Sequence, residues 1–113
     1  MKTTKGMLAQ AYNLLAQAKL DKCDVKERVE VVRALRSVRA EVESIQGFIA
    51  EVQKANADTD AVQLAAVINE ELAKDAEMQD IIRVSEQTME HLVESNEAWN
   101  AAVIMAVEDV FVE

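Results

Sequence analysis

The chain has 113 residues, of which half are apolar and 29% are charged, and its net charge is −9. This length suits one domain, and the composition is typical of a globular protein rather than a disordered one. The absence of proline and the presence of only two glycines argue against a mostly β fold, whereas abundant Ala, Glu, Gln, Leu and Met favour helices. We therefore expect an all-α protein that forms a single helical domain over residues 1–113.

The first two predicted helices cover about residues 4–19 and about residues 24–55. Asp24, followed three residues later by Glu27, has the pattern of a capping box at the start of the second helix. Along that long helix, apolar residues recur at alternating intervals of four and three, which is the pattern of a helix-packing seam. Its members are Val31, Leu35, Val38, Val42, Ile45, Ile49 and Val52. Gly47 lies within the same helix, where a small residue would allow another helix to approach closely.

Residues 56–60, Asn-Ala-Asp-Thr-Asp, predict a break, with Asp60 as the cap of a third helix over about residues 61–76. The residues expected to face inward from this helix are Val62, Ala65, Val67, Ile68 and Leu72. We favour an interruption at residues 80–84 with a short extended piece; the alternative is that the third helix continues through it.

A fourth helix is predicted from Ser85 to about residue 94, and a last one over about residues 97–112, capped by Ser95 or Asn96. Ten of the twelve residues from Ala101 to Val112 are apolar. A helix that is apolar nearly all round has to be covered on most sides. We therefore expect an antiparallel bundle of four to five helices built around the long second one.

Charge is distributed unevenly along the chain. Residues 1–39 carry nine Lys/Arg against four Asp/Glu, and residues 40–113 carry three against seventeen. The simplest interpretation is that the two parts attract each other across the folded bundle. The basic part is small and has little aromatic content, so we do not expect binding to nucleic acid.

The residues that could carry chemistry are few. The single histidine, His91, has Glu94 three residues later, but Thr88 replaces the glutamate that a Glu-x-x-His metal motif would need. Cys23 cannot form an internal disulfide, and a catalytic Cys–His pair is a minor alternative to a structural histidine. We therefore expect no enzyme activity, no metal and no cofactor. Without an apolar run long enough to span a membrane, the expected location is the cytoplasm.

One stretch of the chain resembles a known group of proteins. Residues 68–113, INEELAKDAEMQDIIRVSEQTMEHLVESNEAWNAAVIMAVEDVFVE, look like the tail of a family of small phage and prophage proteins of unknown function. The chain departs from that family in lacking its longer polar middle insertion. The resemblance implies a phage-encoded accessory or structural protein in a bacterial host, and it supplies no functional residues.

These observations predict a non-enzymatic interaction or assembly protein that buries apolar helix faces against a protein partner or a second copy. The residues expected to make that contact are Ile45, Ile49, Val52, Trp99 and Phe111. The alternative is an acidic inhibitor or regulator that binds a basic nucleic-acid-binding enzyme. Salt separates the two hypotheses, because charge-driven binding weakens as ionic strength rises and apolar association does not.

Overall fold

The computed structural model describes residues 3–55, 60–76 and 81–112. Its five α-helices are α1 (Lys5–Ala16), α2 (Val25–Ala55), α3 (Ala61–Leu72), α4 (Glu86–Ser95) and α5 (Ala101–Phe111). The predicted all-α helical bundle with one long helix is confirmed. The 31 residues of α2 rise about 46 Å at 1.5 Å per residue, which accounts for the 48 Å longest dimension of the molecule.

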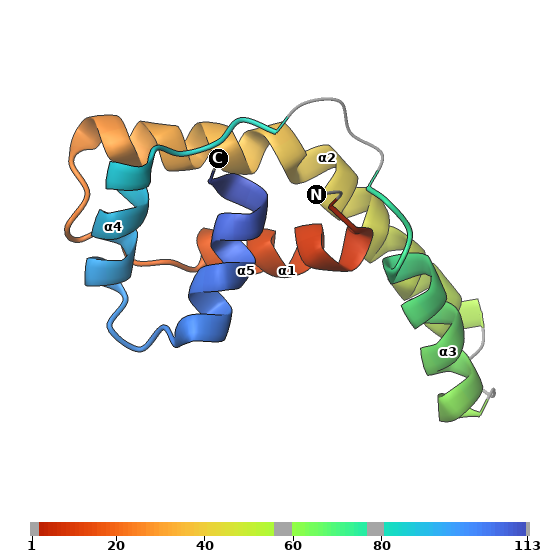
Figure 1. Cartoon of the computed structure of the whole chain (residues 1–113). Helices are drawn as coiled ribbons and strands as arrows, with labels where there is room; N and C mark the ends of the chain where they lie inside the picture. The colour runs from red at the N-terminus through yellow and green to blue at the C-terminus, as the bar shows by residue number, and fades with distance from the viewer. Residues whose placement is uncertain (1–2, 56–59, 77–80, 113) are drawn as a thin grey trace.

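The helices are arranged along and across α2 (Figure 1). Helix α1 runs back along the first part of α2, and α3 runs back along its C-terminal end. Helices α4 and α5 cross α2 steeply instead of lying along it, and α5 packs against α1. The antiparallel arrangement therefore holds for α1 and α3, while α4 and α5 close the body of the bundle from one side.

Local capping contacts explain where the helices begin. The predicted capping box is confirmed, because the Glu27 amide donates to Asp24 Oδ1 at 2.8 Å and the Asp24 amide donates to Glu27 Oε1 at 3.0 Å. Asp60 caps α3 and Ser85 caps α4, as predicted, by accepting from the amides of Val62 and Thr88. These contacts satisfy amide groups that the first turn of a helix leaves unpaired.

The last helix starts later than the sequence predicts. Its cap is Asn100, whose side chain accepts from the amide of Val103, so the predicted start near residue 97 is wrong. Asn96 cannot cap this helix because its side chain is used elsewhere: Oδ1 accepts from the amide of Lys19, and Nδ2 donates to the carbonyl of Leu92. The third helix also ends earlier than expected, at Leu72.

Residues 81–84 are not helical, which agrees with the predicted interruption. Val84 lies beside Val112 in a parallel bridge, and its amide donates to the carbonyl of Phe111 at 2.8 Å. The amide of Ile82 donates to Ser37 Oγ at 3.1 Å, which ties the segment to α2. Asp80 and residues 56–59, on which two predicted breaks depend, lie outside the described residues.

The core is formed by α1, the first two thirds of α2, and the inner faces of α4 and α5. Leu8, Leu92, Val107, Val110 and Phe111 have no exposed surface. The inner face of α5 is thus buried by the rest of the chain, as predicted. Its outer face is not, since Met105 is 60% exposed. Among the described helices, none is both long and apolar enough to cross a membrane.

The two glycines differ in what surrounds them. A Cβ at Gly47 would meet no atom within 4 Å, so the predicted close helix approach at Gly47 is wrong. The close approach occurs at Gly6, where a Cβ would lie 3.3 Å from both the Cβ and the carbonyl oxygen of Leu72. Gly6 therefore allows the start of α1 to lie against the end of α3.

Gly47→Ala is expected to raise the free energy of unfolding by about 0.5–1 kcal/mol, because alanine restricts the unfolded chain and meets no clash in the helix. Urea denaturation measures this change. Gly6→Ala is the control, and it should give a smaller gain or a loss because its new methyl group crowds Leu72. Equal gains for the two variants would contradict the tight α1–α3 contact.

Candidate interaction surface

The C-terminal part of α2 and the whole of α3 form a hairpin that extends from the body of the molecule (Figure 1). We refer to residues 46–55 and α3 as the arm. No residue of α2 beyond Ile45 is buried, and α3 has no buried residue at all. The radius of gyration is 15.5 Å, whereas a compact domain of this length has about 13 Å. The arm therefore extends away from the core.

Helix α3 is mostly apolar, although most of its side chains are exposed to solvent. Eight of its twelve residues are apolar, yet only Leu64, Ile68 and Leu72 among them are even partly covered. These three recur every four residues, which places them on one face of the helix. Val62, at 75% exposed, and Val67, at 49% exposed, lie on either side of that face. The prediction that Val62, Ala65 and Val67 point inward is therefore wrong, since one facing helix can cover only one side of α3.

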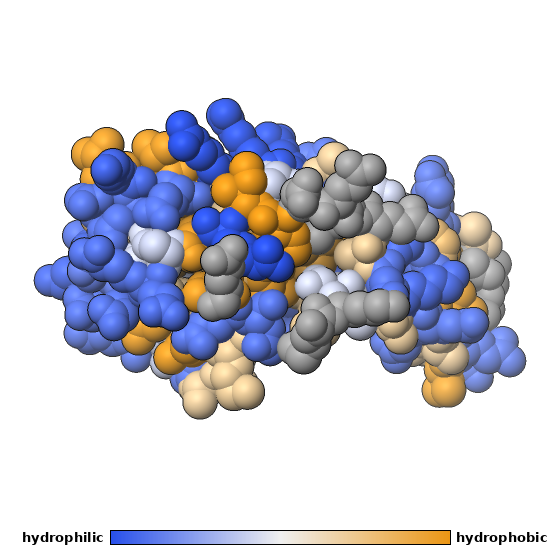
Figure 2. Space-filling view, turned by 45° about the horizontal axis from the view of Figure 1, so that its top comes forward, coloured by the Kyte–Doolittle hydropathy of each residue, from blue (hydrophilic) through white to orange (hydrophobic). Residues whose placement is uncertain are grey.

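Charge is absent from most of this surface. From Ala61 to Asn69 no residue is charged, although the whole chain carries −9. In Figure 2 tan and orange side chains interrupt the hydrophilic surface over the arm, at the right of the view. The first nine residues of α3 are thus uncharged, and Val62 and Val67 add exposed apolar surface to the arm.

A charged cluster fixes the base of the arm. Lys5 Nζ lies 2.6 Å from Glu71 Oε1, and Lys74 Nζ lies 2.8 Å from Glu71 Oε2. The hydrogen bonds from Lys5 and Lys74 lower the pKa of Glu71 below its usual value. The amide of Lys5 also donates to the carbonyl of Lys74 at 2.8 Å. These contacts join the N-terminus of α1 to the C-terminus of α3, as expected if the basic and acidic parts of the chain attract each other.

The five residues predicted to contact a partner fall into two groups. Ile45 is 3% exposed and Phe111 is 0% exposed, so both belong to the core of the folded chain and are not available to a partner. Ile49 and Val52 are partly buried and lie in the arm. Trp99 is partly buried against the core from the turn before α5, not from the helix itself. The structure therefore does not bring the five together on one surface.

His91 pairs with Glu27, a contact between residues 64 apart that the sequence does not predict. His91 Nδ1 lies 2.7 Å from Glu27 Oε2, and the Glu27 side chain is only 7% exposed. The hydrogen bond to Glu27 raises the pKa of His91 above its ordinary value. Because Glu27 also completes the capping box, one carboxylate joins the start of α2 to α4. Glu94, three residues after His91, could also have paired with it, but here it acts as a nearby negative charge.

Other polar contacts hold the two ends of α4. The buried Thr88 donates from Oγ1 to Glu30 Oε2 at 2.7 Å, and the Ser85 amide donates to Glu30 Oε1 at 3.1 Å. At the other end, Ser95 Oγ accepts from the amide of Lys22 at 2.8 Å. Hydrogen bonds between partly buried groups each stabilise a fold by about 1 kcal/mol. Together they fix the position of α4 on α2 and on the segment between α1 and α2.

The surroundings of Cys23 disfavour a reactive thiolate. Burial raises the pKa of the Cys23 thiol, and nearby carboxylates including Glu27 raise it further, so the thiol is protonated near neutral pH. Within residues 3–55, 60–76 and 81–112, no three His, Cys, Asp or Glu residues are grouped so that they could hold a metal ion.

Comparison with protein-family models, with curated proteins and with solved structures finds no match to the chain.

Proposed function

We propose that the chain is a non-enzymatic assembly protein that pairs with a second copy of itself through the arm. The observation that carries this proposal is that α3 is mostly apolar but has no buried residue. Burial of apolar surface contributes about 25 cal/mol per Å², and contiguous exposed apolar surface often marks an interaction site. A role in assembly is also compatible with the resemblance of residues 68–113 to small phage and prophage proteins of unknown function, which implies an accessory or structural protein.

A second copy is the partner that the charge distribution favours. Two chains of net charge −9 repel each other wherever their acidic surfaces meet. The uncharged stretch from Ala61 to Asn69 allows two copies to meet without this repulsion. A two-fold contact brings the same surface of both copies together, so that surface has to be compatible with itself. Pairing two hairpins in this way gives a four-helix bundle, a common way to bury the apolar faces of helices.

Substituting both exposed valines of α3 with glutamate tests this contact. The wild-type chain should approach twice its mass of 12.5 kDa as its concentration rises, and the Val62→Glu/Val67→Glu variant should remain monomeric. Burying two carboxylates without a partner costs far more than the pairing of two short helices can provide. Sedimentation equilibrium gives the masses, and circular dichroism shows that the variant keeps its helices.

The control places the same new charge elsewhere. Val25 is 78% exposed but lies at the start of α2, outside the arm, so Val25→Glu should self-associate like the wild type. If Val62→Glu/Val67→Glu associates as strongly as the wild type, or if Val25→Glu abolishes association, the arm is not the contact.

A further inference from the structure

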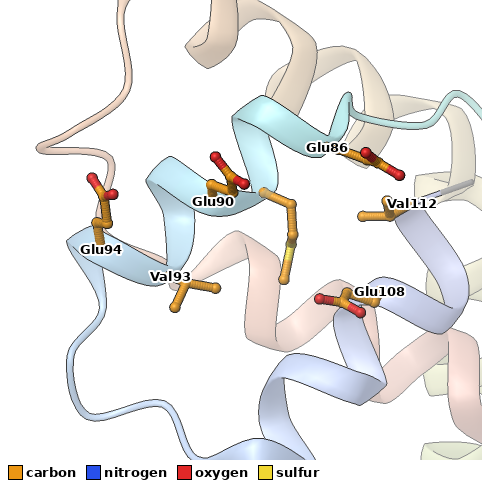
Figure 3. A pocket seen from close by; sticks show the side chains of 7 residues that line it. Glu86, Glu90, Val93, Glu94, Glu108 and Val112 are labelled. Carbon is orange, nitrogen blue, oxygen red and sulfur yellow. The ribbon is translucent and has the colours of Figure 1, made fainter.

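A groove of about 680 Å³ lies between α4 and α5, on the body of the molecule and outside the arm. Its apolar part consists of Met89 and Val93 from α4 and Val112 from the end of α5. Its other lining residues are Glu86, Glu90, Glu94 and Glu108. Figure 3 shows the three glutamates of α4 spaced along one side, with Glu108 and Val112 opposite them on the chain of α5.

All four glutamates are exposed, and none of the seven lining residues is basic. The groove therefore combines an apolar floor with a border of one sign of charge. Such a border attracts cationic groups and repels the acidic surface of a second copy. The groove is therefore suited to a cationic ligand, whereas the partner proposed for the arm is a second copy of this acidic chain.

The arrangement of the glutamates is unfavourable for α4 taken alone. Glu86, Glu90 and Glu94 are each four residues apart, so neighbouring carboxylates lie on one face and repel each other. Glu94 is also in the last turn, where the helix dipole favours cations over anions. Departures from local preference are expected where function requires them. A cationic ligand that lies along this face would relieve both unfavourable effects.

The spacing also specifies the form of the ligand. Glu86 and Glu94 are eight residues apart on one helix, which is about 12 Å. Lysine or arginine side chains four residues apart on a second helix repeat at the same interval. Apolar side chains beside them on that helix would meet Met89, Val93 and Val112. We propose that the groove binds a basic amphipathic helix of another protein, with Lys or Arg every four residues and large apolar side chains next to them.

The groove is formed by elements whose positions are fixed before any ligand binds. Helix α4 is held by Glu27, Glu30 and the segment between α1 and α2 through hydrogen bonds of 2.7–2.8 Å. The end of α5 is tied to the start of α4 through the bond from the Val84 amide to the Phe111 carbonyl. A preformed site loses less conformational entropy on binding than one that has to be ordered.

Fluorescence anisotropy with three labelled synthetic peptides, each about four helical turns long, tests this proposal. The first peptide is an amphipathic helix with lysine on one face and leucine beside it, the second has the same lysines with leucine replaced by alanine, and the third has glutamate in place of lysine. The first should bind tightly, the second at least about tenfold more weakly, and the third not at all. Binding of the first should weaken as salt rises, because surface charges contribute to it.

Substitutions then locate the peptide. Glu90→Lys should weaken binding of the first peptide at least about tenfold, which corresponds to about 1.4 kcal/mol, and Val93→Asp should weaken it similarly by removing part of the apolar floor. Asp21→Lys makes the same change of charge at an exposed residue outside the groove and should leave binding unchanged.

Several results would overturn the proposal: equal binding of the lysine–leucine and lysine–alanine peptides, no binding of the first peptide, or equal losses for Asp21→Lys and Glu90→Lys. Because the Val62→Glu/Val67→Glu variant keeps the groove intact, it should bind the first peptide as the wild type does. The proposal for the groove can therefore fail or succeed independently of the proposal for the arm.

Discussion

Replacing Phe111 with alanine is expected to lower the free energy of unfolding by about 3–5 kcal/mol. The Phe111 side chain is among the largest in the core, and none of it is exposed. Its removal leaves a cavity where α5 meets the rest of the core, and the cavity adds to the lost burial of the ring. A loss of this size is a large part of the 5–15 kcal/mol by which most domains are stable. Urea denaturation followed by circular dichroism measures it.

Met105→Ala is the matched control, because Met105 lies on the same helix and is 60% exposed. It should change the free energy of unfolding by less than about 0.5 kcal/mol. The comparison also separates two roles of Phe111, since the sequence predicts it as a residue that contacts a partner. If Phe111→Ala keeps the stability of the folded chain but reduces its self-association, Phe111 is an interface residue and its burial in the core is wrong.

Glu27→Ala is expected to lower the free energy of unfolding by about 1–3 kcal/mol, because it leaves the Asp24 amide without an acceptor and His91 without its partner. The loss should depend on pH. The hydrogen bond to Glu27 raises the pKa of His91 in the folded chain above its ordinary value of 6.5. The additional stabilisation by protonated His91 is therefore fully present below pH 6.5 and is lost as the pH rises through the raised pKa.

The difference in stability between wild type and Glu27→Ala should accordingly be larger below pH 6.5 than about two pH units above it. It should not vanish at high pH, since neutral histidine can still donate from Nδ1 and the Asp24 amide still needs an acceptor. Glu94→Gln is the control, because Glu94 only adds a nearby charge and should change this pH dependence little. A difference between wild type and Glu27→Ala that grows with rising pH would contradict the ion pair.

The helices and their caps could be predicted because they depend on residues close together in the sequence. The capping box of Asp24 and Glu27 joins two residues three apart, and so does the cap that Ser85 forms on Thr88 at the start of α4. The sequence predicted both caps correctly. A break at residues 80–84 was also predicted, because Ile81, Ile82 and Val84 could form a short extended piece, and residues 81–84 are not helical. The contact of Val84 with Phe111 gives this segment its place in the fold, and no local pattern indicates it.

Contacts between distant residues account for what the sequence did not predict. Glu27 and His91 are 64 residues apart, and each has a nearer residue with which it could pair. Asn96 looked like a cap for the last helix, but it pairs with the backbone of Lys19 instead. Apolar periodicity alone cannot distinguish Phe111, which is buried within the chain, from Val62, which is exposed to solvent. That distinction depends on which distant elements pack around each helix, and local periodicity does not specify them.

Sedimentation equilibrium of the wild-type chain over a wide range of concentrations, in about 0.1 M and about 1 M salt, tests whether the exposed apolar face of α3 joins two copies. If it does, the mass rises toward twice 12.5 kDa with concentration, and the association is at least as strong in high salt as in low salt. A mass that stays at 12.5 kDa at every concentration, or an association that high salt abolishes, would contradict pairing through the arm.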